Sequence, residues 1–215
     1  VFDVVIVGGG LAGCAAAYAL AKAGVEVVVV ERGAFSGSKN MTGGRLYGHS
    51  LEKLIPGFAE SAPVERLITR ERLSFLTDDS ATTMDFASAS LGAPACASYA
   101  VLRAPFDQWL AEQAEREGAM FVNEIRVDDL IVRDGRVCGV RAGEDDMEAK
   151  VVLLADGAVS LLGQKLGMVS PLDPHAMAVS AKEVIQLDEK TVSDRFGCAP
   201  GEGCAWLFDG SCTDG

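Results

Sequence analysis

The first 31 residues carry the pattern that most restricts the fold of this chain. An apolar run, Val4–Val7, leads directly into three glycines, Gly8, Gly10 and Gly13, with the spacing G-x-G-x-x-G. Unbroken β-branched residues are typical of a strand buried on both faces of a parallel sheet. The first glycine permits a tight turn, the second lets a pyrophosphate approach the backbone, and the third lets helix and strand pack closely. The spacing therefore predicts a dinucleotide site.

The residues after the glycines complete a βαβ unit. We expect a helix from Leu11 to about Ala23. Its first backbone amides, among them those of Leu11 and Ala12, are expected to point toward phosphate oxygens. Val25–Val30 predicts the second strand, and Glu31 follows it, 23 residues after the first glycine, where an acidic residue accepts bonds from the adenosine ribose. This order favours a dinucleotide site over the alternative, a glycine-rich turn in another kind of α/β protein.

Composition excludes several classes of function. With 215 residues, of which 49% are hydrophobic, the chain can form one large domain or two intertwined ones. The net charge of −12 argues against binding to nucleic acid and against simple docking on anionic lipid. No apolar run reaches the roughly 18 residues of a membrane span. The apolar start is too short for a signal peptide, because it breaks into the glycine turn.

The sequence offers no metal site and no catalytic set. The six cysteines contain no C-x-x-C pair, and the two histidines are far apart. Cys14 and Cys138 lie in apolar runs, so we expect both to be buried. Reduced thiols in a cytosolic protein are favoured over an irregular iron–sulfur or zinc site at Cys198, Cys204 and Cys212. No catalytic residue is assigned, and Asp128-Asp129 and Asp145-Asp146 are interpreted as solvent-exposed charges.

Between residues 32 and 100 the sequence predicts a loop, a short helix and a hairpin. The polar, glycine-rich stretch from Arg32 to Leu46 is expected to be one long loop, and loops of that length are usually functional. Ser50–Phe58 favours a short helix. Glu71–Ser88 alternates polar and apolar residues around a turn, which is typical of a hairpin with one wet face. Three arginines, Arg66, Arg70 and Arg72, are expected to form a solvated face.

The rest of the chain alternates helices with a meander. Apolar residues at helical spacing predict a helix over Arg103–Gly118, and Asp134-Gly135 between alternating runs predicts a tight hairpin turn. The other expected elements are strands at 119–122, 125–132, 136–141, 147–154 and 175–186, and helices at 161–166 and 189–196. Residues 213–215 look like a turn with no closing element, and we expect a fragment.

Three motifs together resemble a known superfamily. They are the strand–glycine–helix–strand–Glu31 unit, Arg103-Ala-Pro-Phe-Asp107, and Ala-Asp156-Gly157-x-x-Ser. Their order resembles the two-domain flavoproteins of the glutathione-reductase-like superfamily. These include aromatic hydroxylases, geranylgeranyl reductases and electron transfer flavoprotein–quinone oxidoreductases. The resemblance implies FAD as cofactor, with Arg103 at a phosphate or the ribityl region and Asp156 and Gly157 near the pyrophosphate and ribityl chain.

The loop after Glu31 narrows the resemblance to the FixC branch of the quinone oxidoreductases. The matching residues are Gly37, Lys39, Asn40, Gly43, Gly44, Leu46 and Tyr47, followed by Leu51-Glu-Lys-Leu-Ile-Pro56. In that family the loop passes over the flavin ring. The resemblance therefore implies that Lys39, Asn40, Gly43, Gly44 and Arg45 lie on the isoalloxazine side. A cation there would stabilise the reduced flavin and raise its potential.

The resemblance also implies partners. FixC-like members pass electrons from an electron transfer flavoprotein toward quinone, or into a separate ferredoxin-like subunit, and they lack an iron–sulfur cluster of their own. A cytoplasmic location follows, and peripheral contact with the inner face of the cytoplasmic membrane stays open. The superfamily's downstream Gly-Asp flavin motif is not found in these residues.

We therefore predict an α/β, Rossmann-like FAD-binding domain of residues 1–50 and 100–168. Residues 51–99 and 169–215 are assigned to an interleaved, incomplete antiparallel substrate domain. Val127 is added as a backbone contact to adenine. Alternative functions are a geranylgeranyl-reductase-type enzyme, a flavin hydroxylase using NADPH, and a nucleotide-binding scaffold without turnover. The expected cofactor contacts are Gly8, Gly10, Leu11, Ala12, Gly13, Glu31, Arg32, Lys39, Asn40, Gly43, Gly44, Arg45, Arg103, Val127, Asp156 and Gly157.

Overall fold

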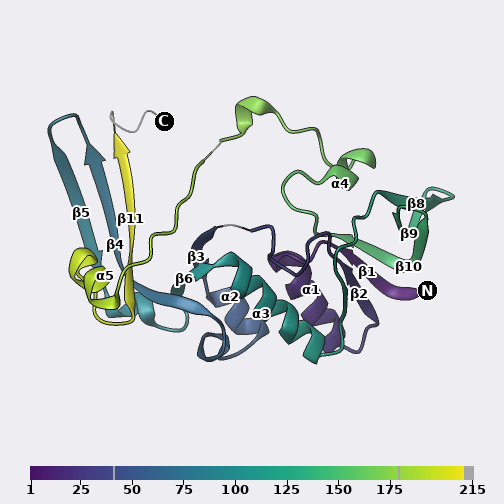
Figure 1. Cartoon of the computed structure of the whole chain (residues 1–215), viewed down its shortest axis with the longest axis horizontal. Coiled ribbons are helices and arrows are strands. Elements are labelled where there is room, and N and C mark those ends of the chain that lie inside the picture. The colour runs from purple at the N-terminus through teal and green to yellow at the C-terminus, as the bar shows by residue number, and fades with distance from the viewer. Residues whose placement is uncertain (41, 179, 211–215) are drawn as a thin grey trace. The chain divides into compact units, whose positions relative to one another are not determined.

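The chain divides into two compact units, each made of two separate segments (Figure 1). The computed structural model describes residues 1–40, 42–178 and 180–210. Unit 1 consists of Val1–Met41 and Arg103–Lys182, and unit 2 of Thr42–Leu102 and Glu183–Gly215. The assignment of the units to cofactor and substrate domains stays a prediction.

Unit 1 is built on a six-stranded sheet with the order β7-β2-β1-β10-β9-β8. The first four strands are parallel, and β10, β9 and β8 form the antiparallel meander expected from the sequence. Val28 and Val29 are fully buried in the centre, as expected for a strand covered on both faces. The strands are β1 (Phe2–Val7), β2 (Val27–Val30), β7 (Met120–Val122), β8 (Asp129–Arg133), β9 (Arg136–Ala142) and β10 (Asp145–Leu154).

Two helices pack together beside the parallel strands. They are α1 (Leu11–Lys22) and α3 (Arg103–Arg116), and both begin where the sequence predicts (Figure 1). A shorter helix, α4 (Leu161–Lys165), follows β10. The predicted strand at 175–186 is wrong: a single turn, η3 (Pro174–Ala176), lies there, and no strand forms in the described residues up to 187. Its apolar side chains, such as Ile185 at 71% exposure, find no neighbouring strand.

Unit 2 is built on a mixed sheet with the order β11-β4-β6-β3, and β5 pairs with β4. All pairs are antiparallel except β11 with β4, which run parallel. The strands are β3 (Gly43–Tyr47), β4 (Val64–Leu76), β5 (Ala81–Ala87), β6 (Ser98–Leu102) and β11 (Glu202–Gly210). The helical elements are α2 (His49–Leu54), η1 (Phe58–Glu60), η2 (Ala89–Gly92) and α5 (Glu189–Phe196).

The fold class is confirmed, with corrections in unit 2. The β4–β5 hairpin and α5 are where the sequence predicts them, whereas β6 and β11 were not expected. The expected loop from Arg32 to Leu46 is wrong from Gly43 onward, because β3 begins there. A Cβ on Gly43 would lie 2.3 Å from the carbonyl oxygen of Val101, so this glycine permits the close approach of β3 to β6.

The arginines of β4 do not form the solvated face that we expected. Arg70 and Arg72 both donate to the carboxylate of Asp85 on β5, at 2.6–2.9 Å. The guanidinium of Arg72 also lies over the ring of Trp206, 4.8 Å from its centroid, and only 13% of the Arg72 side chain is exposed. These contacts connect the β4–β5 hairpin to β11 on one face of the sheet.

The Asp85 ion pairs predict a pH dependence of stability. Hydrogen bonding from Arg70, aided by Arg72, lowers the pKa of Asp85 from 3.8 to about 2. Because the folded pKa is depressed, this contribution to stability is complete above the unfolded pKa and is lost as the pH falls from 3.8 toward 2. Urea unfolding of Asp85→Asn at several pH values should show lower stability at pH 7 and a flatter loss below pH 4. The variant Asp78→Asn at the hairpin turn should keep the wild-type pH profile; an unchanged profile in Asp85→Asn would contradict the assignment.

Candidate functional site

Three segments with predicted cofactor residues meet at one edge of the sheet of unit 1. Val7 on β1 pairs in parallel with Val30 on β2 and with Leu154 on β10, so all three strands end at the same level. The residues that follow these strands therefore meet there: Gly8, Glu31 and Asp156. In open α/β sheets, ligands bind outside the carboxyl ends of the strands.

The three glycines serve different purposes. Gly8 has a φ of +105°, and a Cβ on it would lie 2.4 Å from the carbonyl oxygen of Ala155. A Cβ on Gly13 would lie 1.9 Å from the carbonyl oxygen of Gly8, so α1 packs directly on the turn. At Gly10, in contrast, no atom lies within 4 Å of the Cβ position. The fold itself therefore requires Gly8 and Gly13, whereas Gly10 leaves open space in front of the helix.

The first amides of α1 face that space. Gly10 is the N-cap residue and offers no side chain to cap the helix. No acceptor within residues 1–40, 42–178 and 180–210 bonds the amides of Leu11, Ala12 or Gly13. Free amides and the positive end of the helix dipole form a site for an anionic oxygen. This part of the chain fits a pyrophosphate.

Glu31 is held in place by two backbone amides. Its Oε2 accepts from the amide of Gly9 at 2.7 Å, and its Oε1 accepts from that of Gly33 at 2.6 Å. A carboxylate has about four lone-pair sites, so two remain for the hydroxyls of a ribose. Sequence reasoning found Glu31 but missed Gly9 and Gly33, since neither is marked by a side chain. Arg32, next to it, is exposed.

The residues after β10 complete this edge. A Cβ on Gly8 would lie 3.4 Å from the Cα of Asp156, which places Asp156 beside the glycine turn. Gly157 has a φ of +88°, and no atom lies within 4 Å of its Cβ position. Val127 lies before β8 rather than at the start of a strand, and it packs against the core. Nearby, the amide of Ile125 donates to the carbonyl oxygen of Glu31.

A fully buried carboxylate connects two more of the predicted residues. Asp107, on α3, accepts two hydrogen bonds from Arg103, from Nε at 2.7 Å and from Nη2 at 2.8 Å. It also accepts one from Nδ2 of Asn40 at 2.8 Å. The hydrogen bond to Asp107 raises the pKa of Arg103. Lys39 is exposed. Asp107 ends the motif Arg103-Ala-Pro-Phe-Asp107, and its sequence position alone indicated no role for it.

The thiol of Cys14 packs behind the glycine turn. It is fully buried, as expected, and its Sγ lies 3.2 Å from the carbonyl oxygen of Gly9 and 3.8 Å from Oγ of Ser36. Burial raises the pKa of this thiol to about 12, so it stays protonated at neutral pH. Cys138 is only half-buried. No group of side chains in the described part of the chain could hold a metal ion, and Cys212 lies outside it.

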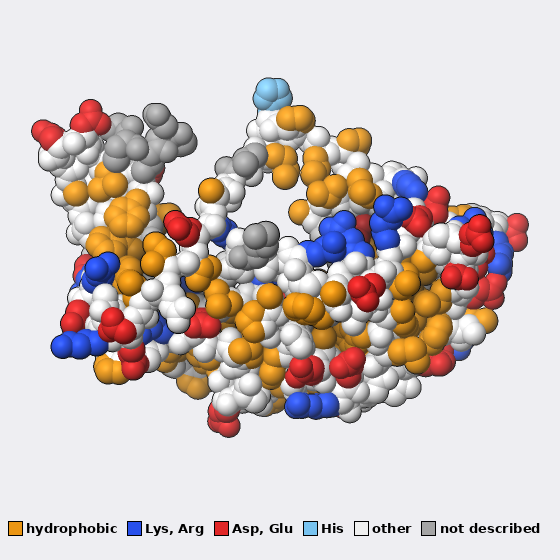
Figure 2. Space-filling model, viewed as in Figure 1, with side chains coloured by type: hydrophobic (Ala, Val, Ile, Leu, Met, Phe, Trp, Pro, Cys, Tyr) orange, Lys and Arg blue, Asp and Glu red, His pale blue; other side chains and the backbone are white. Residues whose placement is uncertain are grey.

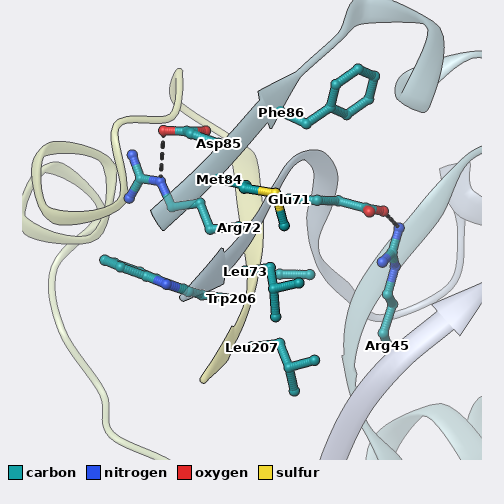
Figure 3. A pocket seen from close by; sticks show the side chains of 10 residues that line it. Arg45, Glu71, Arg72, Leu73, Met84, Asp85, Phe86, Trp206 and Leu207 are labelled. Atoms are coloured by element: carbon teal, nitrogen blue, oxygen red, sulfur yellow. Dashed lines mark hydrogen bonds and ion pairs between the residues drawn. The ribbon is translucent and has the colours of Figure 1, made fainter. Parts of the chain in front are cut away.

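Gly43, Gly44 and Arg45 lie on β3 of unit 2, not on a loop. Arg45 donates from Nε to Oγ of Ser98 at 2.9 Å and from Nη2 to Oε1 of Glu71 at 2.5 Å (Figure 3). Its guanidinium also lies over the ring of Tyr47. The prediction that these three residues contact a flavin stays a prediction.

Unit 2 has a pocket of about 550 Å³ on the hairpin side of its sheet. Figure 3 shows Leu73, Met84 and Leu207 toward its middle, with the Arg45–Glu71 ion pair at one edge. Hydrophobic side chains gather where β4, β5 and β11 lie (Figure 2). The apolar face of the hairpin is itself exposed: Met84 on β5 pairs with Leu73 and has 56% exposure, and Leu207 on β11, which also pairs with Leu73, has 65% exposure. The pocket can therefore receive an apolar molecule.

The chain matches the model of a known protein family. A family model described as GIDA, glucose inhibited division protein A, matches residues 3–192. The chain belongs to this family.

Two curated relatives carry the FixC resemblance. The probable electron transfer flavoprotein-quinone oxidoreductase YdiS of Escherichia coli strain K12 is 55% identical over 214 residues, which is 100% of this chain and 50% of that protein. Protein FixC of the same strain is 54% identical over 215 residues, again 100% of this chain and 50% of that protein. The resemblance to the FixC branch is confirmed. The chain spans about half the length of the curated relatives it matches.

Solved structures agree with the fold class. A geranylgeranyl bacteriochlorophyll reductase-like protein from Thermoplasma acidophilum superimposes with a TM-score of 0.65. It is 27% identical, and the match covers 76% of this chain and 41% of that one. In the described residues of our chain, no helix has the length and apolar character needed to cross a membrane.

The glycine geometry predicts opposite outcomes for two substitutions. Gly13→Ala forces a Cβ against the carbonyl oxygen of Gly8 and should lower the free energy of unfolding by about 1–3 kcal/mol, the usual cost of overpacking. Gly10→Ala meets no neighbouring atom and should cost clearly less, because only the N-cap preference for glycine over alanine is lost. Urea unfolding of the ligand-free chain measures both. Equal losses in the two variants would show that the glycines do not differ in role.

Proposed function

We propose that this chain binds FAD and serves an oxidoreductase that carries electrons from an electron transfer flavoprotein toward quinone. One observation carries the proposal: the parallel ends of β1, β2 and β10 bring the open turn at Gly10, the carboxylate of Glu31 and the backbone at Asp156 to one edge. The names of the 54–55% identical relatives support the same reaction class.

Each of these residues has a distinct task in holding the cofactor. The amides of Leu11 and Ala12 bind pyrophosphate oxygens, and Glu31 accepts the ribose hydroxyls with the lone pairs that Gly9 and Gly33 leave free. Arg103 orients the phosphate or ribityl region. When bound, FAD supplies the redox chemistry of the protein, and the chain contributes binding, orientation and electrostatics.

The pocket of unit 2 supports the proposal that the electron acceptor is apolar. Its apolar side chains, such as Leu73 and Leu207, suit a quinone ring, and the Arg45–Glu71 pair at its edge offers polar groups. The electron transfer flavoprotein as donor, quinone as acceptor and a ferredoxin-like subunit as an additional partner are parts of the proposal. A cytoplasmic location is also part of the proposal, and peripheral contact with the inner face of the cytoplasmic membrane stays open within it.

A second candidate function is reduction of prenyl double bonds. It is supported by the 27% identity to the geranylgeranyl bacteriochlorophyll reductase-like structure. The relatives named as quinone oxidoreductases or FixC are about twice as similar in sequence, which favours electron transfer. Turnover assays with a short-chain quinone and with a geranylgeranyl substrate separate the two.

The first test is the visible spectrum of the purified chain. A flavoprotein absorbs near the blue end of the visible range, and heat should release a chromophore that chromatography identifies as FAD. The FAD-loaded chain should then be reduced by a reduced electron transfer flavoprotein and reoxidised by quinone. A colourless chain that also fails to take up added FAD would contradict the proposal.

Glu31→Ala tests the ribose contact. Loss of a hydrogen bond to a charged group should weaken FAD binding by about 1.5–3 kcal/mol, measured by quenching of flavin fluorescence. Glu26→Ala is the matched control, because it removes the same charge next to the opposite end of β2. If Glu31→Ala and Glu26→Ala bind FAD as tightly as the wild type, the ribose assignment is wrong.

A further inference from the structure

Asp107 stands out as a buried charge that the cofactor proposal does not itself use. Its side chain has 0% exposure, although a carboxylate is almost never fully buried unless it is paired. Both oxygens are occupied by donors from two different segments: Arg103 on the first turn of α3, and Asn40 at the end of the loop after β2. The carboxylate therefore joins the loop to the helix.

The backbone is shaped for this contact. Gly37 has a φ of +90°, and a Cβ on it would lie 2.6 Å from the Cβ of Asp107 and 3.0 Å from the carbonyl oxygen of Ala104. Only a glycine lets the loop lie so close to α3. Two hydrogen bonds form turns in this part of the loop. The amide of Ser38 donates to the carbonyl oxygen of Phe35, and the amide of Asn40 donates to that of Gly37.

Arg103 keeps donors for a ligand while it is held. Its Nε and Nη2 are used by Asp107, and the described residues contain no partner for Nη1. About 30% of the Arg103 side chain is exposed. A guanidinium fixed at two of its nitrogens presents the third in one orientation, at little further cost in side-chain entropy.

We propose that Asp107 is a positioning residue that sets the orientation of both Asn40 and Arg103 toward the flavin half of the cofactor. The inference rests on the proposed function for the identity of the ligand. The docking of the loop on α3 does not, so the two can be tested separately.

The experiment compares three variants of the full 215-residue chain. Asp107→Asn keeps the side-chain volume but brings an amide group against the donors of Arg103 and Asn40. Asn40→Ala removes only the loop's bond and leaves the buried ion pair intact. Leu110→Ala is the control, because it opens a cavity one turn further along α3 at a side chain of 2% exposure, and Leu110 takes no part in the hydrogen bonds of Asp107.

The first measurement is hydrogen exchange of the ligand-free chain. Asp107→Asn and Asn40→Ala should both speed exchange at the amides of residues 38 and 40, whereas Leu110→Ala should leave these two amides as protected as in the wild type. Unchanged exchange in both test variants would overturn the proposal. So would equal acceleration in Leu110→Ala, since general destabilisation would then explain the effect.

The second measurement is FAD affinity together with the visible circular dichroism of the bound flavin. Asp107→Asn should weaken FAD binding by about tenfold and change the flavin band, while Leu110→Ala keeps both. Wild-type affinity and an unchanged band in Asp107→Asn would overturn the positioning role. If the wild type itself binds no FAD, the proposed function fails, and the exchange data still decide whether Asp107 docks the loop.

Discussion

The parallel alignment of β1 with both β2 and β10 is the constraint on which unit 1 depends. It brings the ends of three strands to one level, although they come from residues 2–30 and 145–154 of the chain. The alignment in turn needs α1 to leave β1 through a turn with no side chains in the way. Gly13 meets that need by lying against the carbonyl of Gly8, while Gly10 leaves the space in front of the helix open.

Local patterns were sufficient for most of unit 1. The glycine motif located α1, helical spacing located α3, and the Asp134-Gly135 turn located the β8–β9 hairpin, since both residues of that turn adopt the positive φ that the pair permits. In unit 2 the strands β3, β6 and β11 could not be found in this way. β3 begins with two glycines, a composition typical of a loop, and it becomes a strand because β6, over fifty residues later, lies beside it. Such pairing is decided by tertiary contacts rather than by propensity.

The arginines of β4 show the same limit in a charged cluster. Arg70 and Arg72 flank Glu71 in a polar stretch, a pattern that is typical of a solvated face. What changes their environment is Asp85 on the neighbouring strand and Trp206 on β11, 134 residues beyond Arg72. With one carboxylate and one aromatic ring as partners, the guanidinium of Arg72 can be largely covered without remaining an unpaired charge. The sequence could not reveal this, because neither partner is local.

Two carboxylates of unit 1 illustrate which site residues sequence can identify. Glu31 is half-buried and takes one backbone amide on each oxygen, which leaves acceptor sites for a further partner. Asp107 is fully buried, and three donors from Arg103 and Asn40 surround it, which leaves little for a ligand. Spacing from the glycine turn identifies the first, because the ligand itself imposes that spacing. The position of Asp107 is required only by the packing of a loop on a helix. Its role could therefore be recognised only once the structure showed Gly37 and Asn40 beside α3.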